Sequence, residues 1–114
     1  MKEIRLLLGF MMVSALFASC ASHSAEYRFG AYSAAEDFYQ KGKFGEAAGQ
    51  YEKYIAENPQ GSLVTVASYY LAKCYASLGK TDAAKAGFQK IITAYPKTTW
   101  ADFSKEQLES LGVR

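Results

Sequence analysis

The sequence predicts an all-α protein built as a solenoid of helical hairpins, and three observations lead to this prediction. Two stretches repeat in register, and each ends at one of the two prolines, Pro59 and Pro96, which lie 37 positions apart. A repeat period of roughly 20–50 residues is typical of stacked supersecondary units. Apolar residues within each stretch recur at three- and four-residue steps, which is the spacing of one helix face. Gly42 and Gly79 interrupt this spacing at equivalent places, as a turn between two helices would.

The composition excludes several classes of protein. The chain has 114 residues, 50% of them hydrophobic, which suits one folded domain rather than two or a disordered segment. The net charge is only +2 and the charges are interspersed, so we expect no binding to nucleic acid. Two cysteines and one histidine are too few for a disulfide-rich scaffold, a four-thiolate zinc site or a histidine pair. We therefore expect neither a metal nor a cofactor.

The first element along the chain, residues 1–19, is predicted to be a signal peptide. Lys2 and Arg5 precede an apolar run at Leu6–Phe17, and small residues follow the run. A basic start, an apolar segment of roughly 7–15 residues and small residues at the cleavage point are typical of secretory signals. The run is shorter than the roughly 20 residues that a membrane-spanning helix needs.

Cys20 carries a more specific resemblance. The segment Phe17-Ala18-Ser19-Cys20 resembles the bacterial lipobox, in which Leu usually occupies the place of Phe17. This resemblance implies that Cys20 becomes the mature N-terminus and carries a diacylglycerol and an N-acyl chain such as palmitate. Several acyl chains give stable anchoring in a membrane. The absence of Asp after Cys20 resembles the pattern of lipoproteins retained in the outer membrane of Gram-negative bacteria.

An alternative fate of the N-terminus stays open. Ordinary signal cleavage after Ala21 or Ala25 would release a soluble periplasmic protein without a lipid. In the lipoprotein reading, residues 20–26 are small and polar and form a short tether, and residues 27–114 form the folded domain.

Five helices are expected in this domain, as two hairpins and a final helix. Gly42 and Gly79 end the first helix of each hairpin, because Gly accepts the left-handed conformation at a helix end. Pro59 and Pro96 lie beyond the second helix, because the residue before Pro is disfavoured in the helical region. Thr99-x-x-Asp102 resembles a capping box at the start of the final helix, which should cap the second hairpin. The predicted ranges are Glu26–Lys41, Phe44–Glu57, Leu63–Leu78, Thr81–Ala94 and Thr99–Leu111.

The repeated pattern resembles the tetratricopeptide repeat (TPR). That motif has a small residue and an aromatic in its first helix, followed by Gly, an aromatic, Ala, an aromatic and Pro through its second helix. The first unit supplies Ala35, Phe38, Gly42, Phe44, Ala47, Tyr51 and Pro59, and the second Ala72, Tyr75, Gly79, Thr81, Ala84, Phe88 and Pro96. The resemblance implies a right-handed solenoid of two TPR units plus a C-terminal capping helix. The period exceeds the usual 34 residues, which is similar to a TPR subgroup of bacterial envelope proteins.

A TPR array binds its partners in a groove lined by the first helix of each unit, and the resemblance places a groove here. Helix-face positions then assign to it Phe29, Tyr32, Glu36, Tyr39 and Gln40 from the first unit, and Val66, Tyr69, Tyr70 and Lys73 from the second. Tyrosine is enriched at protein interfaces because it offers a large contact area with a polar tip. A helix or an extended segment of another protein would lie in this groove. Alternatively, some of these tyrosines pack on neighbouring helices.

We find no candidate catalytic group in the sequence. His23 lies in the predicted tether, and nucleophilic catalysis by Cys74 would need a base within hydrogen-bond reach. Cys74 is interpreted as a small buried hydrophobe, and a Cys20–Cys74 disulfide is incompatible with a lipid on Cys20.

The function predicted from the sequence is therefore that of a non-enzymatic adaptor of the bacterial cell envelope. It would be anchored to the outer membrane through Cys20, face the periplasm and bind another envelope protein. The module is similar to the TPR domains of the β-barrel assembly lipoprotein and of the Tol-Pal-associated periplasmic coordinator. The alternative is a soluble periplasmic oligomerisation or structural module. Because solenoids usually need about three repeats for stability, self-association is also possible.

Overall fold

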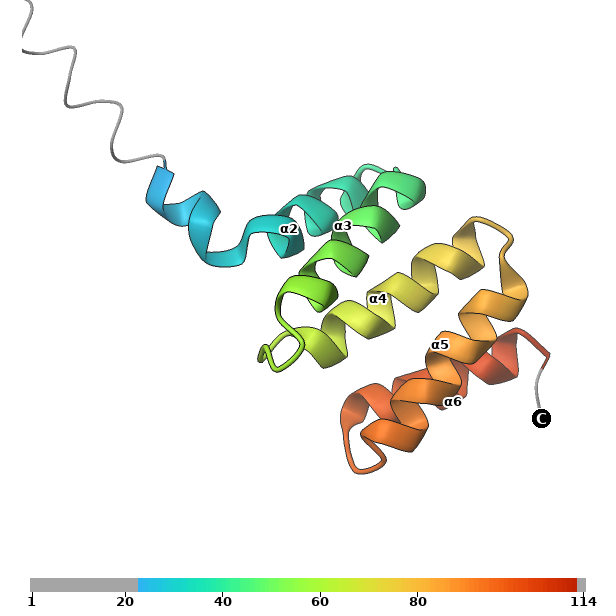
Figure 1. Ribbon diagram of the computed structural model, residues 1–114. Coiled ribbons are helices and arrows are strands. Elements are labelled where there is room, and N and C mark those ends of the chain that lie inside the picture. Colours follow the sequence, from blue (N-terminus) through green and yellow to red (C-terminus); the bar gives the residue numbers. More distant parts are fainter. Residues whose placement is uncertain (1–22, 113–114) are drawn as a thin grey trace, which may run out of the picture. The chain divides into compact units, whose positions relative to one another are not determined.

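A computed structural model describes residues 23–112 of the chain, which form five helices and contain no strand (Figure 1). The predicted signal at residues 1–19 and the lipid site at Cys20 lie outside the described residues. The predicted all-α hairpin solenoid is confirmed, and every predicted helix end lies within three residues of the observed one. The helices are α2 (His23–Gln40), α3 (Phe44–Glu57), α4 (Val64–Ser77), α5 (Thr81–Ala94) and α6 (Thr99–Ser110).

Helix α2 begins at His23, three residues earlier than predicted, so the end of the predicted tether is helical. The helix is broken at Gly30, whose φ of 32° and ψ of −111° are not helical. A positive φ favours Gly because it has no Cβ to clash with the backbone. The chain divides at this residue into two units, Met1–Gly30 and Ala31–Arg114, and the hairpins belong to the second.

The turns inside the two hairpins have the same geometry. Gly42 and Gly79 have φ angles of 73° and 76°. The N–H of Lys43 donates to the carbonyl of Phe38 at 2.8 Å, and the N–H of Gly42 donates to Tyr39 at 3.0 Å. Equivalent bonds follow Gly79. This pair of bonds is the Schellman motif, which satisfies carbonyls that the end of a helix leaves free, so the predicted helix stops are confirmed.

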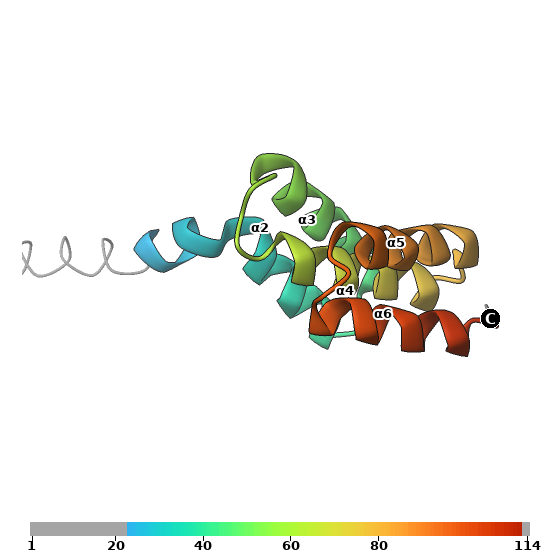
Figure 2. The same cartoon turned by 90° about the horizontal axis from the view of Figure 1, so that it is seen from below.

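The helices of the second unit pack in chain order. Helix α3 contacts α4, α4 contacts α5, α5 contacts α6, and α4 also contacts α6 (Figures 1 and 2). Alanines at the crossings let the helix axes approach, and large rings fill the space beside them. Tyr51 and Phe88 are the largest of these side chains, at 1% and 0% exposure. The fully buried alanines are Ala35, Ala47, Ala67, Ala84 and Ala101.

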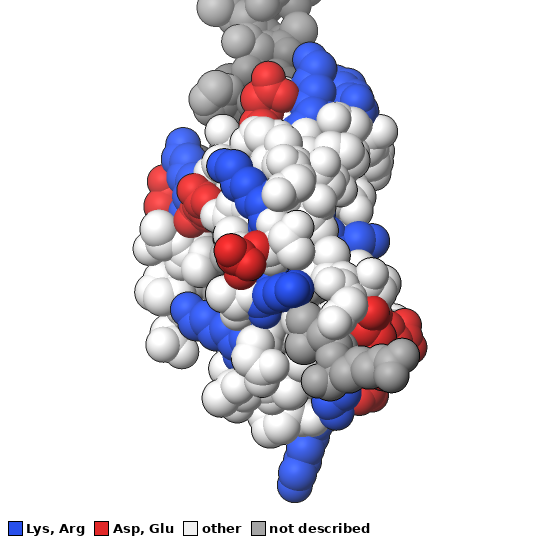
Figure 3. Space-filling view, turned by 90° about the vertical axis from the view of Figure 1, so that its right-hand side faces the viewer, with Lys and Arg blue, Asp and Glu red and all other residues white. Residues whose placement is uncertain are grey.

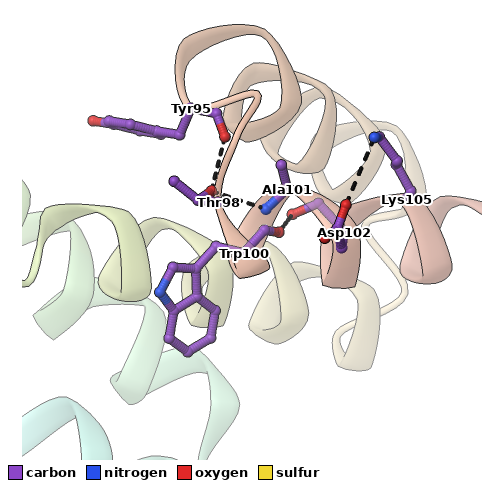
Figure 4. A network of polar contacts seen from close by, with 7 residues as sticks. Tyr95, Thr98, Trp100, Ala101, Asp102 and Lys105 are labelled. Atoms are coloured by element: carbon purple, nitrogen blue, oxygen red, sulfur yellow. Dashed lines mark hydrogen bonds and ion pairs between the residues drawn. The ribbon is translucent and has the colours of Figure 1, made fainter.

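The predicted capping box of α6 was wrong by one residue. Thr98, not Thr99, is the N-cap, with extended backbone angles, and its hydroxyl accepts a hydrogen bond from the N–H of Ala101 at 3.2 Å (Figure 4). The same hydroxyl donates to the carbonyl of Tyr95 at 2.8 Å, which joins the end of α5 to the start of α6. Asp102 instead lies 3.7 Å from the Nζ of Lys105, one helical turn onward.

Candidate binding surface

The first helices of the repeats, α2 and α4, and the final helix α6 share a face on which aromatic side chains meet. We call Tyr39, Tyr70, Trp100 and Phe103 the aromatic row. Successive ring centroids along it lie 5.2, 6.2 and 5.7 Å apart. All three contacts are edge-to-face, an arrangement in which the positive edge of one ring meets the negative face of the next. The row therefore forms one continuous surface across three helices that are far apart in the sequence.

Trp100 joins the row because α6 starts where it does. The Thr98 cap fixes the first turn of α6, and Figure 4 shows the indole of Trp100 extending from that turn toward the neighbouring helices. Its ring centroid lies 5.2 Å from that of Tyr69 and 6.2 Å from that of Tyr70 on α4. Phe103, one turn later, is 39% exposed.

Two of the six tyrosines and charged residues predicted to line the groove belong to the core instead. Tyr32 is 8% exposed, and its ring contacts Tyr51 and Tyr54 of α3. Tyr69 is 6% exposed and contacts Phe88 of α5. These two rings support the surface from below and do not line it.

The remaining predicted residues lie at the surface. Glu36 and Gln40 are exposed, while Tyr39, Tyr70 and Lys73 are half-buried. Val66 is half-buried and packs on the core formed by α2, α3 and α4. Phe29 precedes the residues whose side chains are described.

A hollow of about 200 Å³ opens on this face. It lies between α2, α3 and α4, and Tyr51 forms part of its wall together with Tyr70; the two rings are nearly parallel, at 18°, with centroids 6.2 Å apart. The other lining residues are Glu36, Tyr39 and Gln40. Four of the five lining residues are thus ones that the sequence assigned to the groove, and the fifth, Tyr51, is a motif aromatic of the second helix of the first unit.

The electrostatic character of the face comes from Lys73. Its ammonium lies 5.8 Å from the centroid of Tyr69 and 5.9 Å from that of Tyr70, within the range of cation–π attraction. Burial lowers the pKa of Lys73, but the neighbouring hydroxyls of Tyr39, Tyr69 and Tyr70 raise it more, and the net shift is upward. Lys73 is therefore a fixed positive charge among the rings.

Figure 3 shows basic and acidic side chains interspersed with uncharged ones on the side that it presents. The ion pairs within the described residues are Lys41–Asp37 at 2.7 Å and Lys105–Asp102 at 3.7 Å, both exposed. Exposed pairs of this kind contribute about 0–1 kcal/mol to stability.

Two observations on the described residues bear on nucleophilic and metal chemistry. Cys74 is fully buried, and burial raises the pKa of its thiol to about 11, so the thiol stays protonated at neutral pH. No group of three or more His, Cys, Asp or Glu residues is placed to bind a metal within residues 23–112. In the same range, no helix is both long and apolar enough to cross a membrane.

Sequence reasoning missed the contribution of α6 to this face. The final helix was expected only to cap the second hairpin, and none of its residues was assigned to the groove. The repeat period of 37 residues could have predicted this contribution, because Phe103 lies 37 positions after Val66, which was assigned to the groove.

A second pocket, of about 340 Å³, lies between α3, α4 and α5 and was not predicted. Its walls include Leu71 and Ala72 of α4 and Gly87 and Ile91 of α5. In the sequence these residues have the spacing of helix positions that pack against another helix. The sequence therefore does not distinguish a pocket here from ordinary core packing.

Comparison with known proteins gives one result that bears on this face. A model of the tetratricopeptide repeat matches residues 66–98, which cover α4 from its third residue, all of α5 and the Thr98 cap. The match coincides with the second predicted repeat and shows that the chain contains a TPR-type module. A comparison with curated proteins finds no match.

Proposed function

We propose that this protein is a non-enzymatic adaptor of the bacterial cell envelope that binds another protein on the face formed by α2, α4 and α6. The observation that carries the proposal is the aromatic row beside the hollow, on a module whose repeat type serves protein–protein interaction. Aromatic residues are enriched at the energetic centres of interfaces. Here they are held by packing before any partner arrives, which lowers the entropic cost of binding.

Polar residues border this aromatic centre, as they border many interfaces. Glu36 and Gln40 are exposed at the rim of the hollow, and Lys73 projects among the rings. A polar rim around a centre of rings is the usual anatomy of a specific interface. The exposed rim residues are suited to mutation because they lie outside the buried core, and circular dichroism checks that loss of the contact between Glu36 and Tyr32 leaves the helices intact.

The binding surface is tested by cross-linking and pull-down from a bacterial envelope with Glu36→Lys. Glu57→Lys, an exposed charge reversal near the end of α3, is the matched control. We expect Glu36→Lys to change recovery of the cross-linked partner at least about tenfold, an energetic change of about 1.4 kcal/mol, because the reversed charge lies at the rim of the hollow. Glu57→Lys should leave recovery unchanged. Equal recovery with both variants would place the partner on another surface.

We further propose that the adaptor is held in the outer membrane by lipid on Cys20. The support is the lipobox-like segment that ends at Cys20, directly after an apolar run. Cys20→Ala should move the protein from the membrane fraction to the soluble periplasmic fraction. In the wild-type protein, globomycin should block removal of the signal peptide. A Cys20→Ala protein that still sediments with membranes would refute the lipid anchor, and a soluble, processed wild type would favour the unlipidated module.

A further inference from the structure

The geometry of the α2–α4–α6 face points to a partner of one chemical class: an extended, proline-rich segment with an acidic residue beside its prolines. This inference rests on the proposed function and names what the adaptor binds. Three features of the face carry it, namely the charge at Lys73, the free donor groups of the row and the shape of the hollow.

Lys73 disfavours a cationic ligand over the rings of Tyr69 and Tyr70. The centroids of Tyr69 and Tyr70 lie 5.8 and 5.9 Å from its ammonium, so the chain's own cation already occupies the place that a ligand cation would take over these rings. Within the described residues Lys73 forms no ion pair. A ligand carboxylate near the rings would pair with this charge in a partly desolvated setting, where such pairing is stronger than in water.

The donor groups of the row favour an extended ligand over a helical one. Neither the hydroxyls of Tyr39 and Tyr70 nor the indole N–H of Trp100 donates a hydrogen bond to another described residue. A helix satisfies its own carbonyls internally and offers none to these donors. A polyproline II segment has no internal hydrogen bonds, and all its carbonyls are available.

The shape of the face also fits polyproline II. Its three-residue turn spans about 9 Å, which lies within the upper bound that the successive centroid steps of 5.2 and 6.2 Å set on the distance from Tyr39 through Tyr70 to Trp100. The hollow of about 200 Å³ between Tyr39, Tyr51 and Tyr70 accepts a compact ring. A prolyl ring suits it because proline has no N–H to leave without a partner. Aromatic-lined grooves bind proline-rich segments in several unrelated domains for these reasons.

Trp100 gives this inference a direct readout, because it is the single tryptophan of the chain. The purified protein is titrated with three synthetic peptides of equal length that lack aromatic residues. The first is a run of prolines that contains one Asp. The second has Lys in place of that Asp. The third has Ala in place of the prolines, so that it carries the same charge as the first peptide and favours a helix. We expect a saturable change in Trp100 fluorescence with the first peptide, and affinities at least about tenfold lower for the other two.

Two variants tie the signal to the named residues. Lys73→Gln should remove the preference for Asp over Lys, while Lys90→Gln, an exposed lysine on α5, should leave it unchanged. Tyr70→Phe keeps the ring and removes one donor, so it should weaken binding several-fold without loss of helicity. Isothermal titration calorimetry on the same samples detects binding that leaves the fluorescence unchanged.

Two results would overturn the inference: equal or tighter binding of the alanine peptide, or no saturable binding of the proline–Asp peptide in either measurement. The pull-down with Glu36→Lys separates this failure from that of the proposed function. If the pull-down still captures a partner through the rim, the adaptor function stands and only the class of partner is wrong.

Discussion

Thr98 shows how a single hydroxyl positions part of the binding surface. It accepts from the N–H of Ala101 and donates to the carbonyl of Tyr95, so it links α5 to the first turn of α6 (Figure 4). Trp100 lies two residues beyond it. The sequence offers two adjacent threonines, and only the backbone conformation decides between them, because the cap must be extended while the next residue is helical.

Replacing Thr98 with Ala should therefore destabilise the fold by about 1 kcal/mol, the usual cost of losing an N-cap hydroxyl. Thr99→Ala is the matched control, since Thr99 is exposed in the first turn of α6, and its replacement should change stability by less than about 0.5 kcal/mol. Urea unfolding followed by circular dichroism measures both. A larger loss of stability in Thr99→Ala than in Thr98→Ala would show that Thr99 is the N-cap, as the sequence predicted.

Tyr32 and Tyr69 mark the limit of what motif positions predict. Each lies three residues before the small residue of the motif's first helix, Ala35 and Ala72 respectively, and residues three apart share a helix face. That spacing indicated burial, whereas the motif indicated only the helix on which they lie. How deeply each side chain is buried depends on how closely the next helix approaches, and a single sequence does not give that distance. Of the other predicted groove residues, Glu36 is exposed, while Tyr39 and Tyr70 are half-buried.

At the scale of helices, Gly87 sets how closely α4 and α5 approach each other. A Cβ added at Gly87 would lie 2.9 Å from the Cβ of Ala72, which is too close for two carbons in contact. The backbones would have to separate or tilt. Gly49 lies within α3, and a Cβ added there meets nothing within 4 Å.

The two glycines give a matched pair of predictions with opposite signs. Gly87→Ala should destabilise the fold by about 1–3 kcal/mol through overpacking. Gly49→Ala should stabilise it by about 0.5–1 kcal/mol, because Ala has the higher helix propensity and the site is open. The measurement is thermal or urea unfolding of each variant beside the wild type. Stabilisation by Gly87→Ala would mean that α4 and α5 are not held at this distance.

The helices themselves were the most predictable level of the structure. Their bounds follow from local signals, namely Gly42, Gly79 and the two prolines, and none of these depends on distant contacts. The break at Gly30 was not predicted, since an isolated Gly inside a helical pattern is commonly tolerated. The aromatic row was missed in part because it joins three helices, and its Trp100 step depends on the start of α6.

For the whole molecule, the buried titratable groups predict a loss of stability in alkali. Burial is the main cause that raises the pKa of Tyr32 and Tyr75 from 10.0 to about 12 and that of Cys74 from 9.0 to about 11. Between the unfolded and folded values, the unfolded chain has lost protons that the folded chain retains, so rising pH favours unfolding. Stability should be constant below about pH 9 and fall between pH 9 and 12.

This dependence is measured by urea unfolding across that pH range. Tyr32→Phe keeps the ring in the core and removes one titrating hydroxyl, so its stability should fall less steeply between pH 10 and 12 than that of the wild type. An unchanged slope would show that Tyr32 titrates normally in the folded protein.

The outer side of α6 has a consequence for assembly in chains or fibres. Four charged residues of α6 are exposed, namely Asp102, Lys105, Glu106 and Glu109, beside Thr99, Ser110 and Phe103 of the aromatic row. A stack of hairpins whose last helix exposed an apolar face would bind a second molecule head to tail. When such contacts do not close into a ring, molecules add to the assembly without limit. The charged side chains of α6 make that addition costly, because they would lose water without gaining partners. Head-to-tail growth through this side of α6 is therefore disfavoured.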